Sequence, residues 1–120
     1  IAAHDIDGDG HLDLALGADW KPFNTKTGGT LQWLKRGKNI DDPWTLYPIA
    51  EEPTVHRIRF ADTDGDGKPE LVLAPLMGRN STKEQNWTDG SPVRLIAFKI
   101  PHCFRNPVRN RQTVAKFSRQ

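Results

Sequence analysis

The sequence predicts an all-β chain that consists of two copies of one short-stranded unit. The first observation is that an aspartate- and glycine-rich segment at residues 5–14 recurs at residues 62–71. The second is that apolar and polar residues alternate over short stretches, which is the period-2 pattern of half-buried strands. The third is that no stretch of the 120 residues combines a 3.6-residue apolar period with helix-capping residues.

The repeat is close in both residue type and spacing. Residues 5–14 read DIDGDGHLDL and residues 62–71 read DTDGDGKPEL, so that Asp5 corresponds to Asp62. Farther along the chain, residues 31–35 (LQWLK) match residues 95–99 (LIAFK), and the loop that precedes this match is longer in the second copy. Self-similarity at a fixed period is typical of repeat proteins, whose units bury their apolar faces against one another.

Each copy is expected to contribute about four short strands. Leu12, Leu14 and Leu16 alternate with small or polar residues, and the matching stretch of the second copy ends at Pro75, which cannot donate to a strand ladder. Gly and Asp-Pro clusters separate the other stretches. The strands predicted in this way cover residues 12–17, 30–35, 44–49, 55–61 and 70–74.

Four strands in a unit that runs from Asp5 to Ala61 is the content of a β-propeller blade. We therefore expect a fragment of a β-propeller with about two four-stranded blades, at residues 1–61 and 62–101. Closed propellers have about four to eight blades, so the remaining blades of a larger protein are the expected partners. Residues 102–120 match neither copy, and we expect them to be a disordered or non-native basic tail.

The charge distribution argues against nucleic-acid binding. The chain has a formal net charge of +2, but residues 102–120 hold five basic and no acidic side chains, so the two repeats together are acidic. Binding to nucleic-acid phosphates needs cations clustered on a folded surface.

The single Cys103 cannot form an internal disulfide, and no apolar run approaches the roughly 18 residues that a membrane-spanning helix needs.

The aspartate-rich loops are predicted to bind two Ca²⁺ ions. Carboxylates this dense repel one another unless a cation is present, and Ca²⁺ accepts about six to eight oxygens in irregular geometry, whereas Mg²⁺ requires a near-octahedral shell. An EF-hand is excluded, because its twelfth position would be Leu16 or Leu73. Solvated Asp-Gly turns that bind no ion remain the alternative. The expected ligands are Asp5, Asp7, Asp9, Asp13 and the His11 carbonyl in the first loop, and Asp62, Asp64, Asp66, Glu70 and the Lys68 carbonyl in the second.

The pattern D-x-D-G-D-G-x-x-[DE]-L before a strand resembles the FG-GAP/VCBS repeats of integrin α-chain propellers and many secreted bacterial proteins. The resemblance covers residues 1–101 and implies that each loop joins the first two strands of a blade and binds Ca²⁺ as a structural brace. Glu70 departs from the usual Asp. Since such loops suit compartments with millimolar calcium, we expect a secreted or periplasmic binding or carbohydrate-active protein, with a carbohydrate or protein ligand.

A narrower resemblance suggests an enzyme as the alternative. Residues 52–59 and 74–79 resemble propeller domains related to aldos-2-ulose dehydratase, which implies a sugar dehydratase or lyase with its site on the propeller face. The catalytic candidates are His56, as a general base, with Arg57 and Arg79 as oxyanion or substrate contacts. For each of these residues an ordinary packing or surface role stays open.

The remaining candidates are aromatic and histidine side chains. Trp20 and Trp87 are expected in loops, where they could stack on sugars, whereas Trp33 and Trp44 are expected in strands and in the core. In the strand at residues 55–61, alternation predicts His56, Ile58 and Phe60 on one face and the odd-numbered residues on the other. His4 and His11 are expected at the surface.

Overall fold

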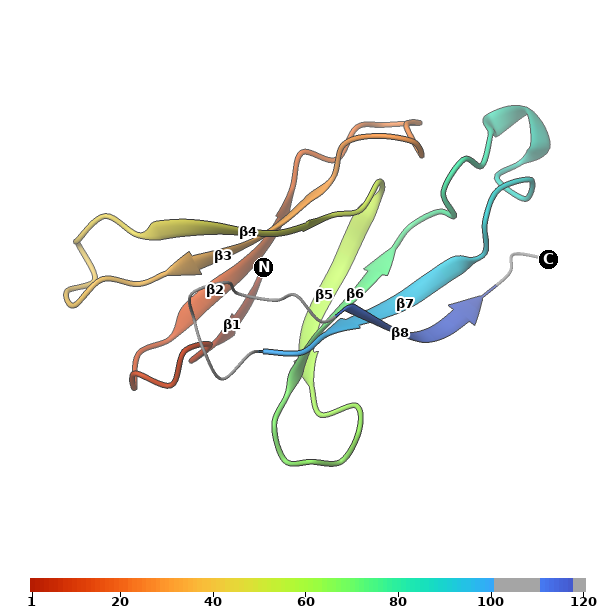
Figure 1. Ribbon diagram of the computed structural model, residues 1–120. Helices are drawn as coiled ribbons and strands as arrows, with labels where there is room; N and C mark the ends of the chain where they lie inside the picture. The colour runs from red at the N-terminus through yellow and green to blue at the C-terminus, as the bar shows by residue number, and fades with distance from the viewer. Residues whose placement is uncertain (101–110, 118–120) are drawn as a thin grey trace.

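The computed structural model describes residues 1–100 and the backbone of residues 111–117, which form two four-stranded antiparallel sheets (Figure 1). The all-β prediction is confirmed, and the described residues contain one short 3₁₀ helix, η1 (Lys83–Gln85), and no helix able to span a membrane. The first sheet has the order β1 (Ala2–His4), β2 (Asp13–Ala18), β3 (Thr30–Lys35) and β4 (Thr45–Glu51). The second has the order β5 (Val55–Ala61), β6 (Glu70–Pro75), β7 (Val93–Phe98) and β8 (Arg111–Phe117).

The boundary between the two blades differs from the expected one at residue 61. Strand β5 pairs with β6, and the chain passes from one sheet to the other between residues 51 and 55. The aspartate loop therefore joins the first and second strands of each blade, as the family resemblance implied, and only the expected boundary between residues 61 and 62 is wrong. The repeat alone could not show this, because a periodic sequence looks the same wherever the period begins.

The fourth strand of the second sheet lies in the segment expected to be a disordered tail. Strand β8 pairs with β7 along its whole length, from Phe98↔Arg111 to Val93↔Phe117. The expectation fails for residues 111–117, because β7 would otherwise leave a row of unpaired backbone groups at the sheet edge. The rest of the expected tail, residues 101–110 and 118–120, lies outside the described residues.

The core lies between the two sheets. Ala15 and Leu31 of the first sheet are fully buried against the second sheet. Trp33 is 1% exposed and stacks on Tyr47 of the neighbouring strand, with ring centroids 4.8 Å apart. The second sheet contributes a row of larger side chains to this core, namely Ile58, Leu71, Leu73, Ile96 and Phe98.

The two sheets pack head to tail. Leu71 and Leu73 of the second sheet face this core, but their repeat equivalents Leu14 and Leu16 alternate with buried Ala15 and lie half-buried on the opposite face of the first sheet. The first sheet thus contributes one face to this core, and the second sheet contributes the face that corresponds, by the repeat, to the opposite one. A head-to-tail contact of this kind continues from unit to unit and closes into a ring when the rotation permits.

A β-bulge at the start of β5 changes the faces expected there. The pairing runs from Val55↔Pro75 directly to Arg57↔Ala74, so His56 is the extra residue. Val55 is buried with Ile58, and its side chain lies against Gly17, where an added Cβ would come within 3.1 Å of it. The expected separation of Val55 from Ile58 is therefore wrong, because the bulge shifts the alternation by one residue.

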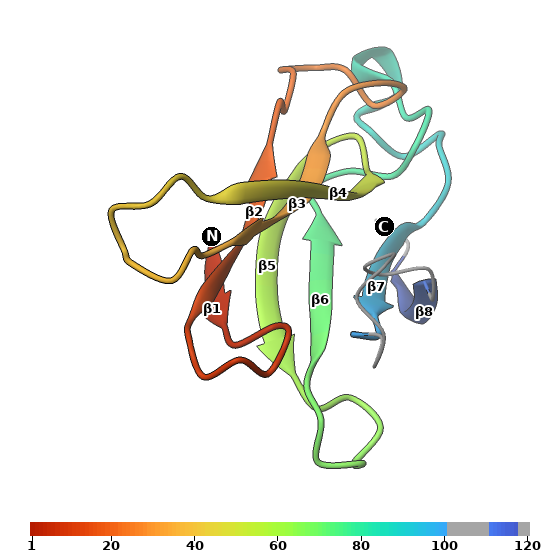
Figure 2. The same cartoon turned by 60° about the vertical axis from the view of Figure 1, so that its left-hand side comes forward.

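The loops are segregated at the two ends of the sheets. The aspartate loops of the β1–β2 and β5–β6 hairpins lie at one end, shown at the bottom of both views. The longer loops at residues 19–29 and 76–92 lie side by side at the other end (Figure 2), where the hydroxyl of Thr25 donates to the Ser81 carbonyl at 2.7 Å. Within the described residues, the aspartate loops and the longer loops thus form separate surfaces at opposite ends of the sheets.

Candidate metal centres

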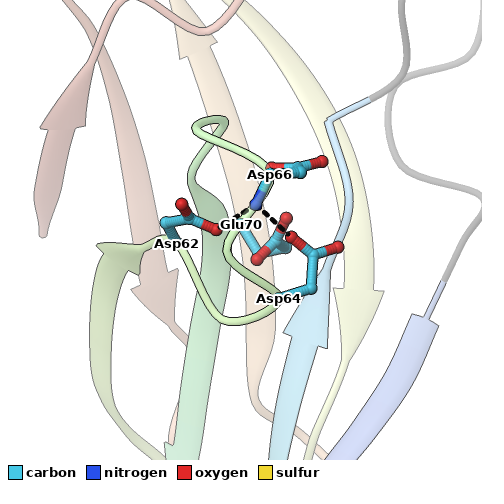
Figure 3. Close-up of side chains that lie close together, drawn as sticks. All are labelled: Asp62, Asp64, Asp66 and Glu70. Atoms are coloured by element: carbon cyan, nitrogen blue, oxygen red, sulfur yellow. Dashed lines mark hydrogen bonds between the residues drawn. The ribbon is translucent and has the colours of Figure 1, made fainter.

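The second aspartate loop brings four carboxyl groups together between β5 and β6 (Figure 3). One ligand atom from each of Asp62, Asp64, Asp66 and Glu70 lies within 4.8 Å of all the others. The three aspartates are exposed, while Glu70 is 3% exposed at the first position of β6. This arrangement suits a hard divalent cation, which binds several carboxylate oxygens at once.

Backbone amides hold these aspartates in place. Asp62 accepts hydrogen bonds from the amides of Gly65 and Gly67 at 2.8 Å each, and also from that of Asp66 at 3.2 Å. The two glycines have φ of 77° and 83°, which lets the chain turn back over the first aspartate. The loop therefore fixes the carboxylates through its own backbone before any ion enters.

The first loop repeats this pattern. Asp5 accepts from the amides of Asp9 at 3.1 Å and Gly10 at 2.8 Å, and His11 donates its amide to Asp9 at 2.9 Å, as Lys68 does to Asp66. Ligand atoms of Asp5, Asp7 and Asp9 lie within 4.8 Å of one another. The same local sequence thus gives the same loop in both blades. The carbonyls of His11 and Lys68 stay predicted ligands, which no described contact tests.

The ninth position of each loop behaves differently in the two copies. Glu70 joins its carboxyl cluster, and its Oε2 accepts the amide of Thr63 at 2.8 Å and the hydroxyl of the same residue. Asp13 does not join the cluster of the first loop, because its Oδ1 accepts the amide of Arg36 at 2.9 Å. The longer side chain of Glu70 reaches the loop, so its departure from the family pattern does not remove it from the site.

One buried oxygen in the first loop tests whether these residues fit a cation. Asp13 is 0% exposed, and its Oδ2 has no hydrogen-bond partner in the described part of the chain. An unpaired buried carboxylate oxygen costs free energy that a nearby cation would recover. The all-oxygen donor set of Asp5, Asp7 and Asp9 makes the first loop fit a hard divalent ion, and Oδ2 of Asp13 would add to it only after its side chain moved toward the cluster.

A lysine reaches each loop from the end of the third strand, and neither lysine was among the predicted site residues. Lys35 forms ion pairs with Asp7 and Asp9, and its repeat equivalent Lys99 lies 2.6 Å from Asp64. The hydrogen bond from Lys99 lowers the pKa of Asp64, and the same bond raises the pKa of Lys99. The signal was present in the repeat, since both LQWLK and LIAFK end in this lysine.

No contact between described residues joins the three catalytic candidates, and their catalytic role stays a prediction. His56 and Arg57 are exposed at the β5 bulge, and no hydrogen bond or ion pair links them to each other or to Arg79 within the described residues. Arg79 instead pairs with the buried carboxylate of Glu52 at 3.3 Å and donates to the Glu51 carbonyl at 3.1 Å. These contacts give Arg79 a structural role, and its role as a substrate contact stays a prediction.

The aromatic candidates divide between core and loops. Trp33 is in the core as expected, but Trp44 is only half-buried and donates its indole N–H to the Ile40 carbonyl at 3.2 Å. Trp20 is 41% exposed, and Trp87 is half-buried in the loop after β6. His4 is also half-buried rather than exposed, because its ring contacts Phe60 between the sheets at 4.9 Å.

The fold and the loops define a repeat segment of a β-propeller, and the comparison with known families agrees. A family model described as FG-GAP-like repeat matches residues 5–73, which is more than half of the chain. The chain therefore belongs to the FG-GAP-like repeat family. Searches of curated proteins and of solved structures gave no match, so the narrower likeness to dehydratase-related propellers has no support from them.

Proposed function

We propose that this chain is a calcium-braced β-propeller segment of a secreted or periplasmic binding protein. The observation that carries the proposal is the pair of equivalent carboxyl clusters, each held by the same backbone hydrogen bonds between the first and second strands of a blade. The same carboxyl cluster thus occurs at the same place in both sheets, where one ion in each would brace the same hairpin. The ion would be structural rather than catalytic.

Calcium suits these clusters better than magnesium. The loops offer carboxylates on a tightly turned backbone with several groups exposed to water, and Ca²⁺ tolerates irregular shells of about six to eight oxygens. Exposed extracellular sites of this kind typically bind calcium with dissociation constants of about 10⁻⁴–10⁻³ M. Sites with such affinities would fill only in a compartment rich in calcium, which is why we propose a location outside the cytoplasm.

The brace would act on the register of neighbouring strands. Each loop joins two strands that face the core through Ala15 in the first sheet and Leu71 in the second. The loop carboxylates repel one another without a cation, so a bound ion favours the closed hairpin over the unfolded chain. The half-buried face of Leu14 and Leu16 is then available to the preceding blade of the complete propeller.

The test is a calorimetric titration of Ca²⁺ and Mg²⁺ into the chain after chelator treatment. We expect the native chain to bind two Ca²⁺ ions and the variants Asp7→Ala and Asp64→Ala to bind one Ca²⁺ ion each. Mg²⁺ is expected to bind more weakly than Ca²⁺. Asp41→Ala is the matched control, because Asp41 is an exposed aspartate of the β3–β4 turn. Absence of binding by the native chain, or a loss of binding in the control as large as in the loop variants, would overturn the proposal.

A further inference from the structure

The two loops at the end opposite the aspartate clusters have an unusual backbone. A bulky side chain at positive φ is rare and costs energy, and such residues gather at functional sites. Phe23 has φ of 60° and Trp87 has φ of 63°. Of the six non-glycine residues with positive φ in the described part of the chain, all except Thr54 lie in these loops, namely Asp19, Phe23, Asn80, Asn86 and Trp87.

Buried hydrogen bonds join the two loops into one body. The hydroxyl of Thr25 donates to the Ser81 carbonyl at 2.7 Å, and the amide of Asn80 donates to the Thr25 carbonyl at 3.2 Å. Thr25 and Ser81 are each 3% exposed. The amide and hydroxyl of Thr82 both donate to Asp89 at 2.7 Å and close the second loop on itself. The surface between the loops is therefore fixed before a ligand arrives.

An open hollow of about 490 Å³ lies between these loops. Phe23 and Trp87 both line it and stack on each other, with ring centroids 6.1 Å apart and planes only 12° from parallel. Phe23 is 69% exposed, and the ammonium group of Lys83 lies 5.2 Å from the centre of its ring. The volume falls within the roughly 300–1,000 Å³ of small-molecule sites.

The charged side chains that line the hollow supply both signs of charge. Lys26 and Lys83 offer ammonium donors, and Glu84 offers a carboxylate acceptor, around the aromatic pair. Asn24 also lines the hollow, but its side chain is committed to Lys26 and Thr27 within its own loop. An aromatic surface with donors and acceptors at its edge can bind a ring that is apolar on one face and polar around its rim.

We propose that the hollow between residues 23–26 and 81–87 binds a pyranose ring of a carbohydrate. The C–H groups on one face of a pyranose are attracted to the negative face of an aromatic ring. The hydroxyl groups around that ring both donate and accept, which matches the ammonium and carboxylate groups at the rim. A purely apolar ligand would leave these charged groups partly desolvated without partners. The positive φ of Phe23 and Trp87 is the energetic cost of presenting the two rings.

This inference deepens the binding role proposed above and does not depend on the metal sites. The test is titration of neutral cello-oligosaccharides and of acidic oligogalacturonates, followed by intrinsic tryptophan fluorescence and by ligand-observed NMR. Trp87→Ala is expected to weaken binding by about tenfold or more, because a ring in direct contact is lost. Phe23→Gly is expected to weaken it similarly while melting no lower than the native chain, because glycine relieves the positive φ.

Trp20→Ala is the matched control, because Trp20 is an exposed tryptophan of the same loop that does not line the hollow. We expect it to bind carbohydrate as the native chain does. The calcium titration of each variant reports whether it is folded. The proposal is overturned if the calcium-binding native chain binds neither class of carbohydrate. Unchanged binding in Phe23→Gly and Trp87→Ala, or an equal loss in Trp20→Ala, would also overturn it.

Discussion

The ammonium nitrogen of Lys99 lies 2.6 Å from Oδ2 of Asp64, and Lys35 contacts the equivalent Asp7 in the first repeat. Lys35 is the last residue of β3 and Lys99 directly follows β7, and these are the third strands of their blades. Both side chains reach the aspartate loop between the first and second strands. Each aspartate loop is therefore paired with the ammonium group of a lysine from its own blade. A divalent ion that binds the same carboxylates must compete with this ammonium group.

The competition predicts that Lys99→Met raises the calcium affinity of the second loop by a few-fold, since exposed ion pairs are weak. Without metal, the same variant should melt slightly below the native chain, because the carboxylates then repel one another unopposed. Calorimetric titration and thermal melts in chelator measure the two effects. Lys38→Met, which removes an exposed lysine of the β3–β4 turn, outside both aspartate loops, is the control. An affinity in Lys99→Met no higher than in the control would contradict the competition.

A structural role for Arg79 predicts a stability change at this residue. Arg79 and Arg94 pair with Glu52, which is 3% exposed, so Arg79→Met weakens the compensation of a buried charge. We expect the free energy of unfolding to fall by about 1–3 kcal/mol. Arg57→Met should change it by no more than about 0.5 kcal/mol, because Arg57 is exposed on β5. Denaturant unfolding measures both variants, and equal stabilities would refute the structural role.

The head-to-tail packing predicts that the chain associates with itself when expressed alone. Leu14, Leu34 and Leu46 lie opposite one another on neighbouring strands, and Leu46 is 52% exposed. Their face of the first sheet corresponds, by the repeat, to the face of the second sheet that forms the core. Light scattering should show a mass that rises with concentration in the native chain and less in Leu46→Lys. Leu76→Lys, in the loop after β6, should associate like the native chain. A native chain that stays monomeric and melts sharply would contradict the prediction.

The Asp89 carboxylate predicts an acid-sensitive loop. The amide and hydroxyl of Thr82 donate to Asp89 and hold its pKa below the usual aspartate value. Because the folded pKa is depressed, this stabilisation is present above the unfolded pKa and is lost as pH falls through the folded value, below about pH 4. An NMR titration should show the Thr82 amide shifting with the Asp89 carboxyl. A carboxyl that titrates at or above the unfolded value would be the contrary result.

The sequence was sufficient to predict five of the eight described strands (β2 to β6), the aspartate loops and the family, because local sequence determines those features. Residues 5–10 and 62–67 fold alike through hydrogen bonds that lie within each loop. The blade boundary and β8 were missed because they depend on pairing between strands distant in sequence. Strand β8 also differs from the first repeat, since it begins among arginines that indicated a basic tail.

The details of the sites needed side-chain positions. Asp13 and Glu70 occupy the same position of the pattern, but only Glu70 reaches its cluster, because Arg36 holds Asp13. The bulge at His56 reversed the expected face of Val55 without any glycine or proline in the strand to indicate it. Phe23 appeared in the sequence as one aromatic residue of a loop, and only its contact with Trp87, in the other repeat, distinguished it.

The most direct measurement of the central claim is the melting temperature in excess Ca²⁺ against that in chelator. One occupied site at about 100 times its dissociation constant contributes about 2.7 kcal/mol. For a domain of this size, two such sites should raise the melting temperature on the order of 10 °C or more. The double variant Asp7→Ala/Asp64→Ala should melt at one temperature in both conditions. A native chain whose melting temperature is the same with calcium and with chelator would contradict the calcium-braced propeller.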